Sequence, residues 1–436
     1  MSSKDLIKTT NEFYDLNERL LMLTGLWPYQ EKFEKFCRTC IVNVSLLLAL
    51  LFEFYRFYTY VFDMKSIVEE FQIFIPLLSG SYCYYNSFFH FELTKKLCDH
   101  VIFDCNHLSN KEEIIIMRKY AKENKRFTVG IALIFYFYII ILTSPSVSHI
   151  FLYITGETND TQLILPVAID TLLLDIRLFY LIFSIQLFIL WVITTVAIVN
   201  YATFLLCVTH ACALLSIIIF KIDQPLKKNS HKLSYDWSST ARYDTYNWIK
   251  DIVNHHVNVT EFIDLLNLLC EQIYLIQMML GTLCFTTDYI YILQISDLIK
   301  NINEAILCII YIGGSVITIY LNCYIGQRLL DHSASLLENL YQVSFYALPI
   351  KYQKDLSMLL MRSLKPCMLS FKGMYIVSND FFARYVQTSL SYAMIYHSFC
   401  KSSILQSLCT YIMRCHIPWQ FILHGRINHR NGHKRI

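Results

Sequence analysis

Long uninterrupted apolar runs constrain the fold of this chain more than any other feature of its sequence. A helix needs about 20 apolar residues to cross the roughly 30 Å hydrocarbon core of a membrane. The runs are continuous rather than alternating, so the pattern favours a helix bundle over a β-barrel. We therefore predict an all-α membrane protein with a seven-transmembrane helix bundle. The predicted spans are about 40–62, 67–91, 127–150, 178–205, 262–295, 302–325 and 373–399.

The composition agrees with a membrane-embedded body and excludes several other classes. Of the 436 residues, 55% are hydrophobic and only 16% are charged, whereas an average soluble domain has about 25% charged residues. A net charge of +3 without a basic stripe gives no reason to expect nucleic acid as a partner. The sequence contains no HExxH, P-loop, dinucleotide-binding or nucleophile-elbow motif. We therefore expect neither an enzyme nor a cofactor or metal site.

The distribution of basic residues indicates on which side of the membrane each predicted loop lies. With the N-terminus inside, the predicted inner segments carry 26 Lys and Arg residues, whereas the outer loops carry only Lys65, Arg177 and Lys300. Cytoplasmic loops are enriched in Lys and Arg, so we expect a cytoplasmic N-terminus. Residues 1–39 then form a cytoplasmic segment, and residues 40–399 form the transmembrane domain. A glycosylation sequon at Asn159 falls in the second outer loop and is a candidate site of modification.

The predicted cytoplasmic side is rich in amphipathic helix. The fourth apolar run continues to Ile222, so it either tilts or continues as a helix beyond the membrane. The segments Glu92–Arg126 and Leu329–Leu364 mix charge with apolar residues at helical spacing. Breaks at Leu348-Pro349 and Lys365-Pro366 indicate that the last helix is split in two. We therefore expect a cytoplasmic helical anchor region, either a compact inner domain or a subunit interface.

A series of motifs near the C-terminus carries a family resemblance. Leu348-Pro349 precedes a basic amphipathic helix, Met361-Arg362-Ser363 and Lys365-Pro366 follow, and Ser391-Tyr392 closes the last span. This series resembles the C-terminal signature of insect odorant receptors, in the style of bees, ants and wasps. The resemblance extends over roughly residues 11–399. It is specific in the C-terminal part and rests mainly on topology elsewhere.

The resemblance implies an odorant-gated, non-selective cation channel. Receptors of this family form tetramers around one pore, usually with a common co-receptor subunit, in the plasma membrane of olfactory sensory neurons. The expected partners are therefore a co-receptor in a heterotetramer, a small volatile ligand, cations in the pore and membrane lipid. The last span lines the pore in this family, and the ligand enters a pocket among the outer halves of spans two, three, four and six.

The last predicted span carries a face that fits a pore lining. Five of its residues recur at spacings of four, three, four and three, which places them on one helical face. Four are polar, and a polar stripe in a span faces protein or water rather than lipid. Ile395 matches the family's gate position and can close a pore by dewetting; Ser398 stands where the co-receptor carries a glutamine. The candidate pore residues are Arg384, Thr388, Ser391, Ile395 and Ser398.

Charged residues within the predicted spans are costly in lipid, so each needs a partner or a water-facing position. Glu53 and Arg56 stand three residues apart near the outer end of the first span, and we expect them to form a local ion pair at the membrane–water interface.

A ring of Arg384 side chains in the predicted pore would repel cations. Three alternatives remain open: Arg384 pairs with Asp380, it lies in a wide inner vestibule, or only some subunits contribute it.

The resemblance also implies a set of candidate pocket residues. A small volatile ligand is held mainly by apolar and aromatic contacts with few hydrogen bonds. Ordinary helix packing explains any single one of these residues equally well, so the prediction concerns the group. The candidates are Tyr82, Tyr85 and Phe89 in span two, Leu133, Ile134 and Phe137 in span three, Phe183 and Leu187 in span four, and Tyr311 and Ser315 in span six.

Other receptor classes fit less well. A gustatory-type chemoreceptor channel is the nearest alternative, but its last span carries Thr-Tyr followed by Gln-Phe, unlike Ser391-Tyr392 and His397-Ser398-Phe399 here. A G-protein-coupled receptor has the opposite orientation and carries signature motifs that this sequence lacks. A secondary transporter is disfavoured because no internal repeat is visible. Residues 400–436 form an atypical basic tail, which we expect to be disordered and without a folded role.

Overall fold

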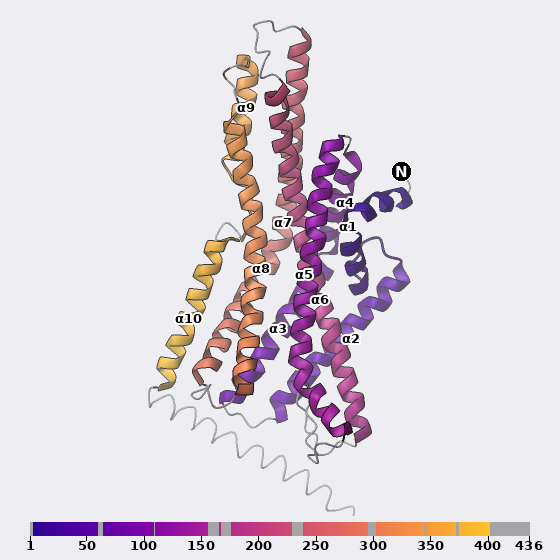
Figure 1. Cartoon of the computed structure of the whole chain (residues 1–436), viewed down its shortest axis with the longest axis vertical. Coiled ribbons are helices and arrows are strands. Elements are labelled where there is room, and N and C mark those ends of the chain that lie inside the picture. Colours follow the sequence, from indigo (N-terminus) through magenta and orange to yellow (C-terminus); the bar gives the residue numbers. More distant parts are fainter. Residues whose placement is uncertain are drawn as a thin grey trace, which may run out of the picture.

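The computed structural model describes most of the chain and is helical almost throughout. It covers residues 3–59, 64–108, 110–155, 165–166, 176–228, 239–294, 302–343, 346, 348–371 and 375–401. Asn159 and the tail from residue 402 onward lie outside the described residues. The elements of Figure 1 are α1 (Ser3–Thr24), α2 (Lys32–Thr59), α3 (Met64–Phe89), α4 (Phe91–His107), α5 (Lys111–Thr155), α6 (Ile176–Lys228), α7 (Ser239–Gln294), α8 (Ile302–Tyr341), α9 (Ile350–Ser363), β1 (Ser370–Phe371), β2 (Tyr375–Ile376) and α10 (Asn379–Lys401).

Helices of membrane-spanning length form the body of the molecule (Figure 1). Five described helices, α2, α5, α6, α7 and α8, contain stretches long and apolar enough to cross a membrane. The two remaining predicted spans correspond to α3 and α10, which are more polar. Glu69, Glu70 and Gln72 lie in α3, and the candidate pore face lies in α10. These polar side chains need partners in protein or water, because lipid offers none.

Several helices are longer than one membrane crossing requires and meet in a compact helical region, called the inner region below. Helix α6 is unbroken over 53 residues and α7 over 56, so the long fourth apolar run does continue as a helix. The later part of α6 is almost completely buried and forms the centre of a core shared with α1, α4, α5, α7, α8 and α9. Leu336 and Leu340 of α8 and Leu356 and Leu359 of α9 pack into the same core. The apolar stripes seen in the sequence therefore pack against one another and form the core of an inner helical domain.

A polar network lies inside this inner core and explains why α6 carries a buried histidine. His210 is fully buried, and its Nε2 lies 3.1 Å from Oδ2 of Asp104. The Tyr14 hydroxyl lies 3.3 Å from His210 Nδ1, and Asn258 Nδ2 donates to Asp104 Oδ1 at 2.8 Å. Burial alone would raise the pKa of Asp104, but the hydrogen bonds from His210 and Asn258 outweigh it and hold the pKa below its ordinary value. The network thus ties α1, α4, α6 and α7 together.

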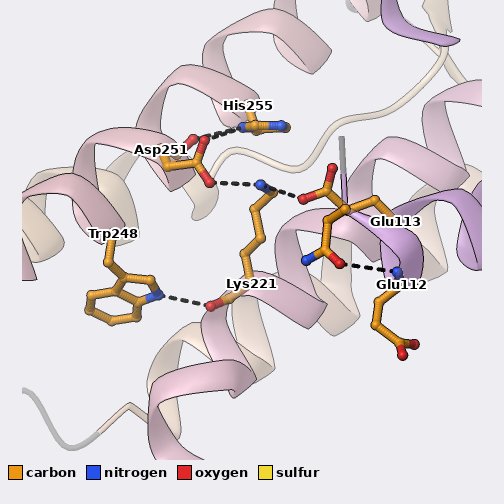
Figure 2. Close-up of polar contacts among 7 residues, drawn as sticks. Glu112, Glu113, Lys221, Trp248, Asp251 and His255 are labelled. Carbon is orange, nitrogen blue, oxygen red and sulfur yellow. Dashed lines mark hydrogen bonds and ion pairs between the residues drawn. The ribbon is translucent and has the colours of Figure 1, made fainter. Parts of the chain in front are cut away.

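A lysine at the inner end of α6 joins three helices (Figure 2). Lys221 Nζ lies 2.7 Å from Glu113 Oε1 of α5 and 2.6 Å from Asp251 Oδ2 of α7. The Trp248 indole donates to the Lys221 carbonyl at 2.8 Å, and His255 Nδ1 lies 3.3 Å from Asp251 Oδ1. Because Glu113 is buried, loss of the ammonium would leave an unpaired carboxylate inside the protein.

Neutralising Lys221 is expected to loosen the inner domain. Lys221→Gln should destabilise the folded receptor by about 2 kcal/mol, less than for a fully buried pair because Asp251 is half-exposed. The purified receptor should then unfold at a lower temperature and reach the cell surface in smaller amounts. Lys250→Gln, at an exposed position of α7, is the matched control and should leave both measurements unchanged. Equal losses in the two variants would contradict a specific role for Lys221.

The last helix is split, but by a hairpin that the sequence pattern did not predict. Helix α9 ends at Ser363, and β1 pairs antiparallel with β2 with Ser370 opposite Ile376. Helix α10 begins at Asn379 rather than at 373, because the Ser378 hydroxyl accepts the Phe381 backbone N–H at 3.3 Å and caps the helix. The hairpin is held against α7 by Asn267, whose Nδ2 donates to the Met368 carbonyl at 3.0 Å.

Candidate ligand pocket and pore helix

Three helices bring a buried polar cluster together in the membrane part. Asp288 of α7 is 1% exposed and Gln72 of α3 is 3% exposed. Gln72 Nε2 donates to Asp288 Oδ1 at 3.0 Å, and the Ser315 hydroxyl of α8 donates to Asp288 Oδ2 at 2.6 Å. Within the described part of the chain, no Lys or Arg forms an ion pair with Asp288. The carboxyl is therefore held by two neutral donors.

Two tyrosines border this cluster. Tyr311 stands one turn before Ser315 on α8, and Tyr138 of α5 reaches the same part of α8 at Gly314. The Tyr138 ring packs directly on Gly314, where a Cβ would lie 2.8 Å from a ring carbon. Gln72 Oε1 is buried and has no hydrogen-bond partner among the described residues. A buried acceptor without a donor is costly, so a donor group on a bound molecule would relieve this cost.

A cluster of three charged residues, Glu53, Arg56 and Glu70, lies near Gln72 at the same end of α3. Arg56 Nη2 of α2 lies 2.5 Å from Glu70 Oε1 of α3, and both side chains are almost fully buried. Glu53, which is 2% exposed, also interacts with Glu70. The sequence suggested a local pair between Glu53 and Arg56 at the interface. The structure extends this: Arg56 also pairs with Glu70 of the next helix, because α2 and α3 pack side by side and bury all three groups.

The predicted pocket residues do not all meet at this place. Tyr311 and Ser315 lie at the Asp288 cluster. Phe183 stacks on Phe179 in a separate apolar cluster with Ile150, and Leu187 is half-buried one turn further along α6. The contact of Phe183 and Leu187 with a ligand stays a prediction.

The candidates in spans two and three lie elsewhere, because neighbouring helices run in opposite directions. Helix α3 runs toward the end that carries α4, so its last residues lie near the inner region (Figure 1). Tyr85 stacks on Phe89 there with ring centroids 6.3 Å apart, and Tyr82 is half-buried nearby. On α5, Leu133, Ile134 and Phe137 are exposed on the outside of the bundle. The structure therefore does not bring these six residues to the Asp288 cluster.

Sequence reasoning missed Asp288 and Gln72 as candidate site residues. A signal was present, because Asp288 is an ionisable residue inside the fifth apolar run, and such residues face the protein interior and mark functional sites by default. Its partners could not be read from the sequence, since Gln72, Asp288 and Ser315 come from three separate helices.

Helix α10 packs on the bundle with one face and leaves the other uncovered in this chain. Tyr385, Ser389 and Ala393 are buried against α7 and α8, and the Tyr385 hydroxyl donates to the Met278 carbonyl at 3.2 Å. A Cβ at Gly281 would lie 2.5 Å from that hydroxyl, so the close approach requires glycine. The exposed residues of the opposite face include all the candidate pore residues, Arg384, Thr388, Ser391, Ile395 and Ser398.

The polar residues of the exposed face are partly satisfied by their own helix. The Thr388 hydroxyl donates to the Arg384 carbonyl at 2.8 Å, and the Ser391 hydroxyl donates to the Gln387 carbonyl at 2.9 Å. Ile395 is 52% exposed. No ion pair joins Arg384 to Asp380 in the described part of the chain, and both side chains are exposed. The structure therefore does not support a local pair of Arg384 with Asp380. The other two explanations stay open: Arg384 lies in a wide inner vestibule, or only some subunits contribute it.

The fold and the polar interior of the bundle define an all-α, multi-pass membrane protein. The family model for the 7tm odorant receptors matches residues 89–390. The chain belongs to the seven-transmembrane odorant receptor family. The family resemblance, the all-α membrane fold and the expectation of a receptor rather than an enzyme are thereby confirmed.

Individual relatives agree with this assignment. Odorant receptor 85f of Drosophila melanogaster is 34% identical over 92 residues, which are 21% of this chain and 23% of that receptor. The match therefore spans less than a quarter of that relative. The structure of the olfactory receptor OR5 of Machilis hrabei in complex with eugenol aligns with a TM-score of 0.68 and 11% identity over 91% of this chain and 100% of that one. A second structure of the olfactory receptor OR5 of Machilis hrabei aligns with a TM-score of 0.68 and 11% identity over 90% of this chain and 99% of that one.

Proposed function

We propose that the chain is the odorant-binding subunit of an odorant-gated, non-selective cation channel. Membership of the odorant receptor family over residues 89–390 is the observation that carries this proposal. The similar OR5 structure is a complex with eugenol, a small volatile phenol, which supports a small volatile ligand of similar size for this chain. The receptor would act in the plasma membrane of olfactory sensory neurons, with its N-terminus in the cytoplasm and residues 40–399 as the channel-forming domain.

The proposed ligand pocket is centred on Asp288. Its carboxyl and the unpaired Gln72 Oε1 provide acceptors, and Tyr138, Tyr311 and Ser315 provide aromatic surface and hydroxyls. Pockets for small ligands combine apolar walls with a few such polar groups. A volatile with a hydroxyl or amine donor would satisfy the buried acceptor and gain apolar contact.

The proposed pore is lined by the exposed face of α10. A face that carries Arg384, Thr388, Ser391 and Ser398 is poorly suited to lipid, and α10 stands at the edge of the bundle, where other subunits can reach it (Figure 1). Ile395, near the outer end of this face, is the proposed gate. Four such helices around one axis would place their polar faces toward a water-filled path.

Co-expression is the decisive experiment for the proposed channel. Cells expressing this chain with an odorant co-receptor should give odorant-evoked cation currents that persist when G-protein signalling is blocked. The chain alone should give none, because Arg384 and Ser398 make an unfavourable pore when all subunits contribute them. Robust odorant currents from the chain alone would contradict the need for a co-receptor, and currents abolished by the G-protein block would contradict direct gating.

A further inference from the structure

A basic cavity lies between the inner parts of α5 and α8, away from the proposed pocket and pore. Its volume is about 760 Å³. Arg118, Lys119, Lys122 and Arg126 of α5 line one side, and Arg328 of α8 lines the other. Positions 118, 119, 122 and 126 recur at helical spacing, so α5 presents them along one face.

The charge of this cavity is strongly one-sided. Five cationic side chains line it, against a single carboxylate, Glu123. That carboxylate lies 3.0 Å from the Arg328 guanidinium and is thereby balanced. Lys119, Lys122 and Arg126 in the lining are exposed to solvent, so their charge is available to a molecule that enters the cavity.

The floor of the cavity is polar and ordered. The Tyr120 hydroxyl lies 2.7 Å from Ser216 Oγ of α6 and 2.7 Å from His332 Nε2 of α8. The Arg328 guanidinium lies over the Phe127 ring, 5.5 Å from its centroid. These contacts fix the two helices relative to each other, so the cavity is largely preformed.

The cavity lies beside the point where the apolar run of α5 begins. Arg126 is the last charged residue before the apolar run that begins at Phe127. By the charge rule this boundary faces the cytoplasmic leaflet, which is rich in anionic lipids and attracts basic clusters. The cationic row from residue 118 to 126 extends about 12 Å along the helix, which is longer than a single phosphate.

We propose that this cavity binds the headgroup of a polyphosphorylated inositol lipid of the cytoplasmic leaflet. Guanidinium groups bind phosphate oxygens in pairs, and lysines add point charges. A headgroup with several phosphates can reach the cations of both helices, while its acyl chains remain in the bilayer beside α5. Lipid bound in this way bridges α5 and α8 at the inner edge of the membrane.

Binding of a short-chain fluorescent phosphatidylinositol 4,5-bisphosphate to the purified full-length receptor tests the proposal. Each neutralised cation should weaken binding about fivefold, so the triple variant Lys119→Gln/Lys122→Gln/Arg126→Gln should bind about 100-fold more weakly. Lys125→Gln removes an exposed α5 charge that does not line the cavity and should bind like the wild type. Unchanged binding by the triple variant, or an equal loss in Lys125→Gln, would overturn the proposal.

Competition distinguishes lipid from soluble anions. Unlabelled phosphatidylinositol 4,5-bisphosphate should displace the probe, while phosphatidylinositol without ring phosphates should not. ATP and inorganic phosphate at millimolar concentration should compete only weakly. If ATP or inorganic phosphate displaces the probe as well as the unlabelled lipid does, the cavity is a soluble-anion site and the lipid assignment is wrong.

Discussion

Ile395→Ala is expected to raise the resting current of the co-expressed channel severalfold. Ile395 is exposed on the face of α10 that points away from the bundle, beside Ser391 and Ser398. A ring of isoleucine side chains excludes water from a narrow pore, and alanine both widens the ring and removes apolar surface. Water and ions then pass more readily in the absence of odorant. Whole-cell recording before and after odorant addition measures the effect.

A control on the same helix separates gating from a general disturbance of α10. Met394→Ala shortens an exposed apolar side chain at the neighbouring position, which lies about 100° around the helix. It should leave the resting current at the wild-type level. If Ile395→Ala also leaves both resting and evoked currents unchanged, Ile395 does not line the gate.

Asp288→Asn should raise the odorant concentration needed for half-maximal current by about tenfold or more. The asparagine keeps the shape of the side chain and one acceptor, but it replaces the second acceptor with a donor that faces the Ser315 hydroxyl. A lost or mismatched hydrogen bond at a buried site costs about 1–3 kcal/mol. A ligand that donates to this group loses binding free energy of the same order.

The response must be compared at equal surface level, because Asp288 also holds α3 and α8 together. Surface labelling should show a smaller loss for Asp288→Asn, which keeps the packing and one acceptor, than for Asp288→Ala, which leaves two buried donors unpaired. Glu338→Gln, at an exposed position of α8, is the control for loss of an acidic group. A wild-type dose–response curve for Asp288→Asn would place the odorant elsewhere in the protein.

Much of the fold could be predicted because it follows from local patterns. Apolar runs of membrane-spanning length predicted the long helices, and the stripes containing Leu336, Leu340, Leu356 and Leu359 predicted their inner continuation. The breaks at Pro349 and Pro366 correctly divided the last helix. The short hairpin between its halves was missed because two-residue strands carry no periodic signal.

The candidate site could be predicted only in part. The polar face of α10 follows from helical spacing alone, and its exposure agrees with that pattern. The pocket candidates in α3 and α5 were chosen by residue type and spacing, without regard to the direction in which each helix runs. Neighbouring spans run in opposite directions. Residues at the same position within two successive apolar runs therefore lie at different depths in the membrane.

The sequence by itself determined the class of this protein: the helix positions, the polar face of α10 and the family motifs are all encoded within single segments. The tertiary structure decided which buried polar groups meet. It paired Arg56 with Glu70 of the next helix, joined Gln72, Asp288 and Ser315 from three helices, and set the cations of α5 opposite Arg328. The physical reason is that a buried charge or amide forms its hydrogen bond with whichever polar group packing brings within about 3 Å. Which residues of distant helices come that close cannot be read from the sequence of either helix alone.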